Sequence, residues 1–532
     1  MKKQVICVAA ALVVLGQTAF GGGQAAQPRQ GGGASQSSGG KTLIVRAFGD
    51  PLSFQPDTIP DDYNFAIVQN IYNRLVKLDA SKSIIPDLAK SWETNGDGLR
   101  ITFHLEQGVR WHDGAPFTSK DVKYTFDVIK ANDTYFGYTV LTNVASIETP
   151  DDYTVIFNMV KPDVSVIGYL GWYATFILPE HIFNNGQAWG ENPASNKPIG
   201  TGPFKFVRFT PGVSVELEKN SDYWQSQVQL DRLIFSIIPD SSTAVQAMLN
   251  GELDILETAP DSELDLLRAG GITLVSNVYP SPFYIAFNFK GEYETPYAVR
   301  KALALCVNRE EIANKVFNDV RSPEYNFYPS VVEWASNSRA RAPAYSIQEA
   351  VKTLEDAGYR KDAAGYYVRG LEIIVYNDGG APDVATLISA ACREAGIELI
   401  VRPMEYQAWS QQVWENVNSP TGTFKIALMG GFQGPDPAAL QTRVGTRALN
   451  NIGQYSNTEI DGLFDRALIN SDRGYRQPLY FRVQEILAAE LPIIPVVNYA
   501  TFDAQAANVR MAPVQCAGIA GWAEFSYTYL EN

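Results

Sequence analysis

The stretch PDLAKSWETNGDGLRITFHLEQGVRWHDGAPFTSKDVKYTFDVIK, residues 86–130, decides the fold. Alternate residues between Leu99 and Leu105 are apolar, which predicts a strand with one buried face. The turn at 112–114 (His-Asp-Gly) follows it. Thr118 and Asp121 have the spacing of a capping box, and apolar residues then recur at helical spacing. The stretch therefore predicts a half-buried strand, a tight turn and an amphipathic helix in succession.

Strands and helices alternate on both sides of this stretch. A strand at 371–376, a helix from Asp383 to Gly396 and a strand at 397–403 predict a parallel strand pair with a helical crossover. We expect further strands at 42–48, 154–160, 253–256 and 283–289, a hairpin at 200–220, and helices at 64–78, 239–250, 299–305 and 479–490. Three more capping-box patterns open helices, at Asn308 with Glu311, Ser346 with Glu349 and Ser456 with Glu459. The fold class is α/β, and its natural architecture is two lobes with a ligand cleft between them.

The amino terminus has the pattern of a secretory signal peptide. Lys2 and Lys3 precede an apolar run at 5–15 that is too short to span a bilayer, and small residues follow it. We expect cleavage between Ala19 and Ala26 and therefore export to the periplasm or the cell surface. No Cys lies at 17–23, just after the apolar run, so no lipid anchor is expected. Residues 27–40 are rich in Gly, Ser, Gln and Ala, which predicts a flexible linker.

The composition excludes some classes of function. The net charge of −15 gives no basic surface for nucleic-acid phosphates. Only three histidines are present, His104, His112 and His181, and their spacing matches no metal site. The chain contains no nucleophile-elbow, zinc-protease or dinucleotide-binding motif, so we expect neither an enzyme nor a cofactor.

Three cysteines follow the expected signal peptide, which leaves at least one unpaired. Cys306 and Cys392 lie in apolar helical patterns, which favours buried free thiols. The sequence does not decide whether any two of Cys306, Cys392 and Cys516 pair.

Residues 86–130 closely resemble the signature of extracellular solute-binding protein family 5. The matching residues are Ala89, Trp92, Asp97, Gly98, Thr102, Phe103, Leu105, Gly108, Val109, His112, Asp113, Gly114, Pro116, Asp121 and Val122. Later stretches agree in order, among them PIGTGPFKF (198–206) and VRKALALCVNREEI (299–312), so the resemblance extends from residue 41 to the carboxyl terminus. In this family the His-Asp-Gly turn is a structural motif away from the ligand.

The resemblance implies a two-lobed periplasmic-binding-protein-like fold of type II, cluster C, with an extra subdomain in the larger lobe. The expected segments are 1–26 for the signal peptide, 27–40 for the linker, 41–76 with 198–277 and 502–532 for the main part of lobe I, 77–197 for its accessory subdomain, and 278–501 for lobe II. It also implies a monomer that closes on its ligand and docks on an ABC permease with its ATPase, without catalysing a reaction.

Relatives that bind peptides hold the peptide amino terminus with an acid just before an Asp-Pro element. Here the element is Asp436-Pro437, but Phe432, Gln433 and Gly434 precede it and none is acidic. Either Asp436 serves as the anchor, or the ligand is held in another way, since a buried ammonium without an anionic partner is costly. The further candidate ligand-binding residues are Trp172, Tyr173, Trp409, Trp414, Ser53 and Arg443.

The sequence therefore does not decide the identity of the ligand. An oligopeptide or dipeptide is the first expectation, a di- or oligosaccharide stacked on Trp side chains is the alternative, and a nickel complex is less favoured because histidine is scarce. A secreted hydrolase and a sensory binding protein are the competing classes.

Overall fold

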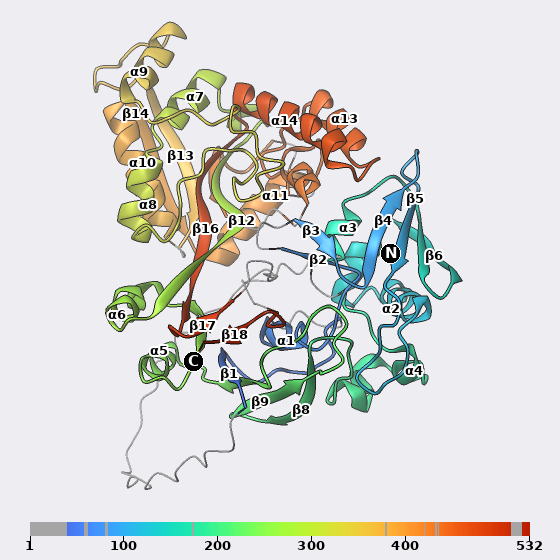
Figure 1. Cartoon of the computed structure of the whole chain (residues 1–532). Helices are drawn as coiled ribbons and strands as arrows, with labels where there is room; N and C mark the ends of the chain where they lie inside the picture. The colour runs from blue at the N-terminus through green and yellow to red at the C-terminus, as the bar shows by residue number, and fades with distance from the viewer. Residues whose placement is uncertain are drawn as a thin grey trace.

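A single sheet of ten strands runs through two α/β lobes (Figure 1). The computed structural model describes residues 40–57, 62–79, 83–172, 175–377, 380–419, 421–430, 434, 436–448, 450–511 and 524–531. The strand order is β14-β13-β15-β12-β16-β11-β1-β10-β9-β8. Because strands of both lobes share this sheet, the backbone hydrogen bonds of the sheet continue from one lobe into the other.

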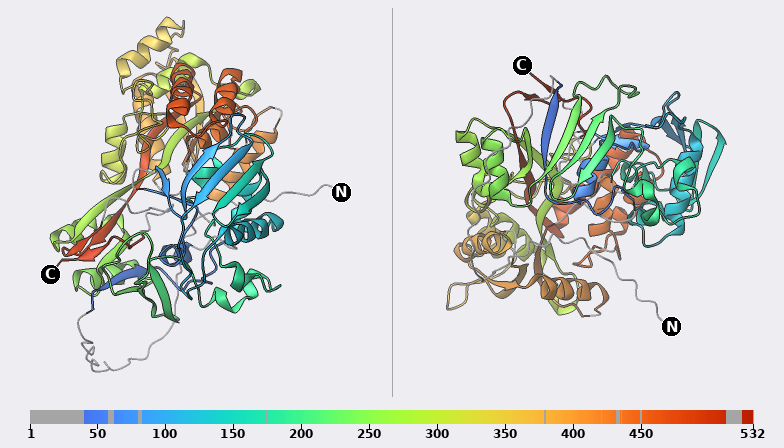
Figure 2. Two further views of the ribbon diagram at one scale, coloured as in Figure 1. Left: turned by 45° about the vertical axis from the view of Figure 1, so that its right-hand side comes forward. Right: turned by 90° about the horizontal axis from the view of Figure 1, so that it is seen from below.

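Two long strands carry the chain between the lobes. β12 (Thr273–Phe287) and β16 (Ile493–Gln505) pair antiparallel, and they run side by side from the lower to the upper lobe in Figures 1 and 2. Their register shifts between Val278 and Pro282 and again between Phe283 and Tyr284. We call this irregular segment, where the strands leave one lobe and enter the other, the crossing point.

Lobe I is built on the strands at one end of the large sheet. β1 (Thr42–Ala47) is parallel to both β10 (Arg232–Ile237) and β11 (Ile255–Ala259), while β9 (Ser214–Lys219) and β8 (Phe204–Thr210) continue the sheet antiparallel. Helices α1 (Asp62–Val68), α5 (Ser241–Leu249) and α6 (Leu264–Ala269) belong to this lobe. The carboxyl-terminal pair β17 (Val509–Arg510) and β18 (Tyr529–Leu530) returns to it.

An accessory subdomain of lobe I is built on a separate antiparallel sheet. Its order is β4-β5-β7-β6, with bounds Ala89–Thr94, Arg100–Leu105, Thr154–Met159 and Val144–Asp151. The predicted capping box is confirmed at Thr118, where α2 (Ser119–Ala131) begins. The remaining elements are β2 (Val76–Leu78), β3 (Ile84–Pro86), α3 (Val166–Tyr169), α4 (Glu180–Phe183) and the 3-10 turns η1 (Phe136–Leu141), η2 (Trp189–Glu191) and η3 (Pro193–Ser195).

Lobe II contains the predicted strand-helix-strand unit. β13 (Val368–Tyr376) and β14 (Ile397–Met404) are parallel and α10 (Ala381–Glu394) connects them, while β15 (Ile426–Met429) joins β13 to β12. The other helices are α7 (Tyr297–Leu305), α8 (Arg309–Phe317), α9 (Ile347–Asp356), α11 (Tyr406–Asn418), α12 (Gln441–Val444), α13 (Thr458–Ala467) and α14 (Arg473–Glu490). Three 3-10 turns complete the two lobes, η4 (Asp261–Glu263), η5 (Gly291–Tyr293) and η6 (Pro437–Leu440).

Three of the predicted helix ends were wrong. The helix expected at 64–78 ends at Val68, although the apolar residues beyond it are buried as the pattern required. The helix expected from Ser456 is capped by Asn457, whose side chain accepts hydrogen bonds from the backbone of Glu459 and Ile460. The helix expected at 479–490 begins six residues earlier at Arg473, with Asp472 as its cap and Pro478 inside its second turn. Tertiary burial and the choice between adjacent caps decided these ends.

The described hydrophobic side chains form one large core in lobe II, another that spans lobe I and its accessory sheet, and a smaller cluster in lobe I. Cys306 and Cys392 both lie in the lobe II core as free, buried thiols, as predicted. A hydrogen bond with Cys306, together with burial, raises the pKa of the Cys392 thiol. Cys516 lies outside the described residues. Among the described helices, none is both long and apolar enough to cross a bilayer.

Candidate functional site

Strands of both lobes end at the crossing point. β16 runs from lobe II into lobe I, and β11 is antiparallel to it, so that Ala259 at the carboxyl end of β11 lies nearest the crossing point. β15 is antiparallel to β12 in the same way, which brings Met429 to the crossing point from the other side. β1 is parallel to β11, and β13 to β15, so their carboxyl ends face the same region. Ligands of α/β proteins bind outside such strand ends, so the candidate site lies between the lobes.

A cavity of about 330 Å³ lies between the accessory subdomain and lobe II. We call it the interlobe cavity, and its volume is within the range of sites for small organic ligands. Its lining residues are Asp79, Ser83, Ile84, Ile85, Trp92, Val164 and Ile167 from lobe I, and Trp334, Asp436, Pro437, Ser471, Arg473 and Arg476 from lobe II. Because both lobes contribute aromatic and charged side chains, a solute held here would contact both at once.

The two lobes touch directly beside this cavity. The backbone N–H of Val164 donates a hydrogen bond to the carbonyl oxygen of Leu468 over 3.0 Å. Gly168 in α3 lies against Asp436, and a Cβ atom at Gly168 would be 3.3 Å from the Asp436 Cβ. The absence of a side chain at Gly168 thus allows the accessory subdomain to approach lobe II closely.

Asp436, the predicted anchor, lines the cavity but is already paired within the protein. Arg476 donates to both carboxylate oxygens, over 2.9 Å to Oδ2 and 2.6 Å to Oδ1, and the backbone N–H of Ala438 donates to Oδ1 over 2.9 Å. The Asp436 side chain is 1% exposed and that of Arg476 is 3% exposed. Asp436 therefore caps η6 and neutralises a buried guanidinium, and a role as ligand anchor stays a prediction.

The predicted tryptophans lie in the cores rather than around the cavity. Trp172 is buried in the lobe I core. Trp409 is buried in the lobe II core against Tyr376 and Tyr406, and Trp414 packs on the same core half-buried. These tryptophans were candidates because a flat ring can stack on a sugar, and such rings are equally typical of protein cores, so their contact with a ligand stays a prediction.

Ser53 follows β1 in the loop that leaves the carboxyl end of that strand. Its side-chain oxygen accepts a hydrogen bond from the backbone N–H of Gln55 over 2.9 Å, which stabilises a local turn. Ser53 is half-buried. The remaining candidates, Phe432, Gln433 and Tyr173, lie outside the described residues.

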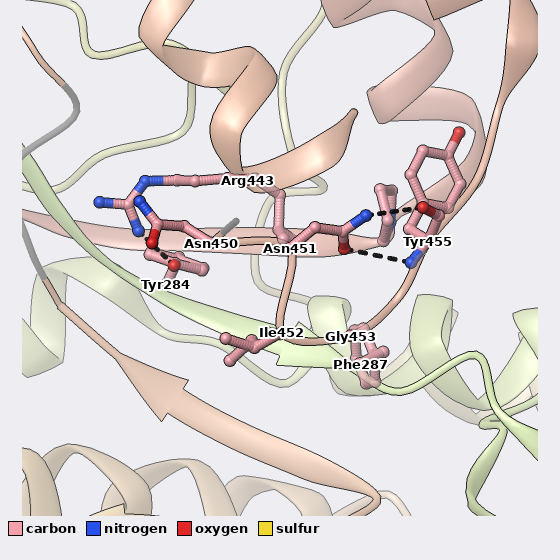
Figure 3. A pocket seen from close by; sticks show the side chains of 11 residues that line it. Tyr284, Phe287, Arg443, Asn450, Asn451, Ile452, Gly453 and Tyr455 are labelled. Carbon is pink, nitrogen blue, oxygen red and sulfur yellow. Dashed lines mark hydrogen bonds between the residues drawn. The ribbon is translucent and has the colours of Figure 1, made fainter. Parts of the chain in front are cut away.

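Arg443 lies inside lobe II, beside a small internal pocket of about 10 Å³ (Figure 3). Its Nη1 donates a hydrogen bond to the hydroxyl of Tyr284, and its guanidinium carbon is 4.8 Å from the centre of the Tyr284 ring. On the other side of the pocket, Asn451 bonds to both backbone groups of Tyr455. A pocket of this volume has room for no more than about one water molecule. A role of Arg443 in binding a ligand stays a prediction.

The sequence did not indicate Trp334, Arg473 or Arg476 as site residues. The guanidinium carbons of Arg473 and Arg476 lie 5.2 Å and 5.7 Å from the Trp334 ring centre. These contacts connect the start of α14 with a loop that lies almost 140 residues earlier in the sequence. Trp92 was part of the family signature, but nothing local to it indicated a cavity. No spacing rule connects such distant segments, because only the tertiary fold brings them together.

All three histidines lie in the accessory subdomain. His112 donates from Nε2 to the carbonyl oxygen of Gly202 over 3.0 Å, and its Nδ1 accepts from the backbone N–H of Gly200 over 3.2 Å. Burial lowers the pKa of His112 to about 4, so it is neutral at pH 7. His181 bonds to Asp113, and His104 lies 3.8 Å from Glu93. The His-Asp-Gly turn is therefore structural, and the described residues contain no cluster that could hold a metal ion.

Asp503 is a buried carboxyl next to the crossing point. It accepts hydrogen bonds from the backbone of Thr258 over 2.9 Å and from the Asn277 side chain over 2.6 Å. Burial is the largest effect and raises the pKa of Asp503 to about 6. At pH values between the ordinary pKa of an aspartate and about 6, the folded state keeps the proton of Asp503 while the unfolded state loses it. The free energy of unfolding therefore decreases as the pH rises through this range.

The Asp503→Asn variant should therefore become more stable relative to the natural chain as pH rises from 4 to 7, by up to about 3 kcal/mol. Urea unfolding of both proteins at each pH measures the difference, and any change in hydrogen bonding with Asn277 appears as an offset that does not depend on pH. A difference that stays constant across this range would contradict the assignment.

Two α/β lobes, linked by long strands and enclosing a cavity, define a two-lobed solute-binding protein. Its fold matches that of HbpA2 from Haemophilus parasuis with a TM-score of 0.82 at 24% sequence identity, covering 92% of this chain and 100% of that one. The family model for bacterial extracellular solute-binding proteins, family 5, matches residues 83–448. The chain belongs to this family.

Curated relatives of this chain carry names for different ligands. Di/tripeptide-binding protein 1 of Pseudomonas aeruginosa is 27% identical over 520 residues, which cover 91% of this chain and 94% of that protein. Heme-binding protein A of Haemophilus influenzae is 26% identical over 509 residues, covering 89% and 90%. The family thus keeps one fold while its members differ in the solute named.

Proposed function

We propose that this chain captures a peptide between its lobes and delivers it chemically unchanged to an ABC permease driven by its ATPase. The observation that carries the proposal is the interlobe cavity, which side chains of both lobes line. Strand ends of both lobes converge on the crossing point. The near full-length similarity to a di/tripeptide-binding protein supports a peptide as the solute.

Capture follows from the way the lobes are joined. β12 and β16 link the lobes, and their irregular register at the crossing point provides a hinge. A ligand that contacts both lobes stabilises the closed arrangement over the open one by its additional contacts, which shifts the population without chemistry. The closed form is then the form that the permease receives.

We further infer that the mature chain is exported, acts as a monomer and catalyses no reaction. The signal-peptide pattern supports export, and family membership supports a transport role in place of catalysis. Turnover of any compound by the purified protein would contradict this part of the proposal.

Three other ligands, a metal complex, a haem and a saccharide, need a different site chemistry. A metal complex or a haem is most often held by imidazole nitrogen, but the three histidines lie in the accessory subdomain and at least two of them are engaged in structural hydrogen bonds. A di- or oligosaccharide would use stacking rings, and Trp92 and Trp334 at the interlobe cavity offer such rings. The saccharide is therefore the second candidate.

Isothermal titration calorimetry of the mature protein against dipeptides to pentapeptides, maltose and cellobiose oligomers, haemin and the nickel–histidine complex tests the proposal. We expect saturable one-to-one binding for peptides alone, and stabilisation by about 2.7 kcal/mol at a peptide concentration of 100 times Kd. Binding of an oligosaccharide without any peptide would replace the proposal with the second candidate.

A further inference from the structure

Arg321 lies at the crossing point of the two lobe-connecting strands. The loop after α8 carries it, and two contacts fix this loop there: the backbone N–H of Asn498 in β16 donates to the Ser322 carbonyl over 2.9 Å, and Pro323 forms a bridge with Val497. Val320, on the other side, is buried in a core cluster of lobe I together with Ala504. Arg321 is therefore positioned where strand ends of both lobes converge.

Three aromatic rings from three elements surround the Arg321 guanidinium. Its central carbon is 4.7 Å from the ring centre of Phe283 in β12, 4.1 Å from that of Phe317 in α8 and 5.0 Å from that of Tyr499 in β16. Tyr376, at the carboxyl end of β13, lies 6.4 Å from Phe283. Such ring contacts attract a cation and restrict its orientation, but they satisfy none of the five N–H donors of a guanidinium.

Among the described residues, no acceptor serves these donors. Arg321 forms no hydrogen bond and no ion pair, although it is half-buried. Asp261, which follows β11 in lobe I, is within electrostatic range but does not reach it as an ion pair, and partial burial raises the pKa of Asp261 despite Arg321. The other buried arginines differ, because Arg476, Arg309 and Arg300 each donate to oxygen atoms of the protein.

An oriented, partly desolvated guanidinium without an acceptor is a site for a planar anion. Guanidinium binds carboxylate through two parallel hydrogen bonds, and partial burial strengthens such a pair relative to one in open solvent. A captured peptide brings a carboxylate at its carboxyl terminus. We propose that Arg321 binds the terminal carboxylate of the captured peptide at the crossing point, with Phe283, Phe317 and Tyr499 holding the guanidinium in place.

This assignment rests on the proposed function, and it adds which end of the peptide lies at the crossing point. It also accounts for the missing acid before Asp436-Pro437, because a peptide held by its carboxylate depends less on an anchor for its ammonium. A carboxylate on Arg321 would also lie beside the strand that links the lobes, because the centre of the Tyr499 ring in β16 is 5.0 Å from the guanidinium carbon.

The test compares the shortest alanine peptide that the natural chain binds, from dialanine to pentaalanine, with its C-terminal amide. We expect Arg321→Gln to weaken binding of the free acid about 10- to 100-fold, and the amide to bind the natural chain more weakly by a similar factor. Arg321→Gln should then discriminate little between acid and amide, so that the two changes are not additive in a double-mutant cycle.

Arg341→Gln is the matched control, since Arg341 also lies over an aromatic ring, 4.5 Å from the centre of Tyr325, but its side chain is exposed. It should leave both affinities unchanged. If Arg321→Gln still prefers the acid to the amide as strongly as the natural chain does, the assignment is overturned while peptide capture stands. If the natural chain binds no peptide at all, the proposed function and this assignment fail together.

Discussion

Replacing Gly200 by alanine is expected to lower the free energy of unfolding by about 3 kcal/mol or more, because overpacking against rigid backbone cannot relax cheaply. A Cβ atom at Gly200 would lie 1.9 Å from the carbonyl oxygen of Ile71. That same oxygen accepts the backbone N–H of Gly202 over 2.8 Å. The two glycines thus let the loop after residue 198 lie directly on the backbone at Ile71, between the His-Asp-Gly turn and the main sheet.

Guanidinium chloride unfolding of the two proteins measures this loss. Gly96→Ala is the matched control, because nothing lies within 4 Å of a Cβ at that exposed position. The control should stay within about 0.5 kcal/mol of the natural chain. Should Gly200→Ala fail to fold, its loss of soluble yield relative to Gly96→Ala reports the same effect. Equal stability of the two variants would show that the close approach to Ile71 is not needed.

Replacing Asp436 by alanine is expected to cost about 3 to 5 kcal/mol of stability, because it leaves the buried Arg476 guanidinium without its anion. Arg476 would retain the carbonyl oxygen of Ala467 and the Tyr480 hydroxyl, which carry no full charge. Nearby negative charge on Asp436 now raises the pKa of Arg476 against the effect of burial. Thermal and denaturant unfolding measure the loss.

An exposed ion pair provides the comparison for Asp436. Glu459 and Arg482 form an ion pair of 2.8 Å in which both side chains are about half exposed. Glu459→Ala should cost no more than about 1 kcal/mol, since water screens such a pair. The double variant Asp436→Asn with Arg476→Gln should recover part of the loss. If Asp436→Ala lowers the free energy of unfolding no more than Glu459→Ala does, the buried ion pair does not stabilise the packing of η6 against α14. If peptide affinity falls in Asp436→Asn while stability is kept, Asp436 also contacts the ligand.

The local pattern of the sequence determined the elements and the family. The alternation from Leu99 to Leu105 corresponds to β5, and the spacing of Thr118 and Asp121 corresponds to the cap of α2. The parallel pair of β13 and β14 followed from one strand-helix-strand unit. Periods of two and 3.6 residues arise from backbone geometry within a few residues, so the sequence displays them directly.

Tertiary structure alone decided which residues surround the space between the lobes. Trp92, Trp334 and Arg476 meet at one cavity although more than 380 residues separate the first from the last, and Asp436 turned out to face a buried arginine in addition to that cavity. Arg321 gained its place from two strands whose paired residues are more than 200 positions apart in sequence. Contacts of this kind depend on how whole lobes pack, because packing buries distant side chains together without leaving any mark on their local spacing.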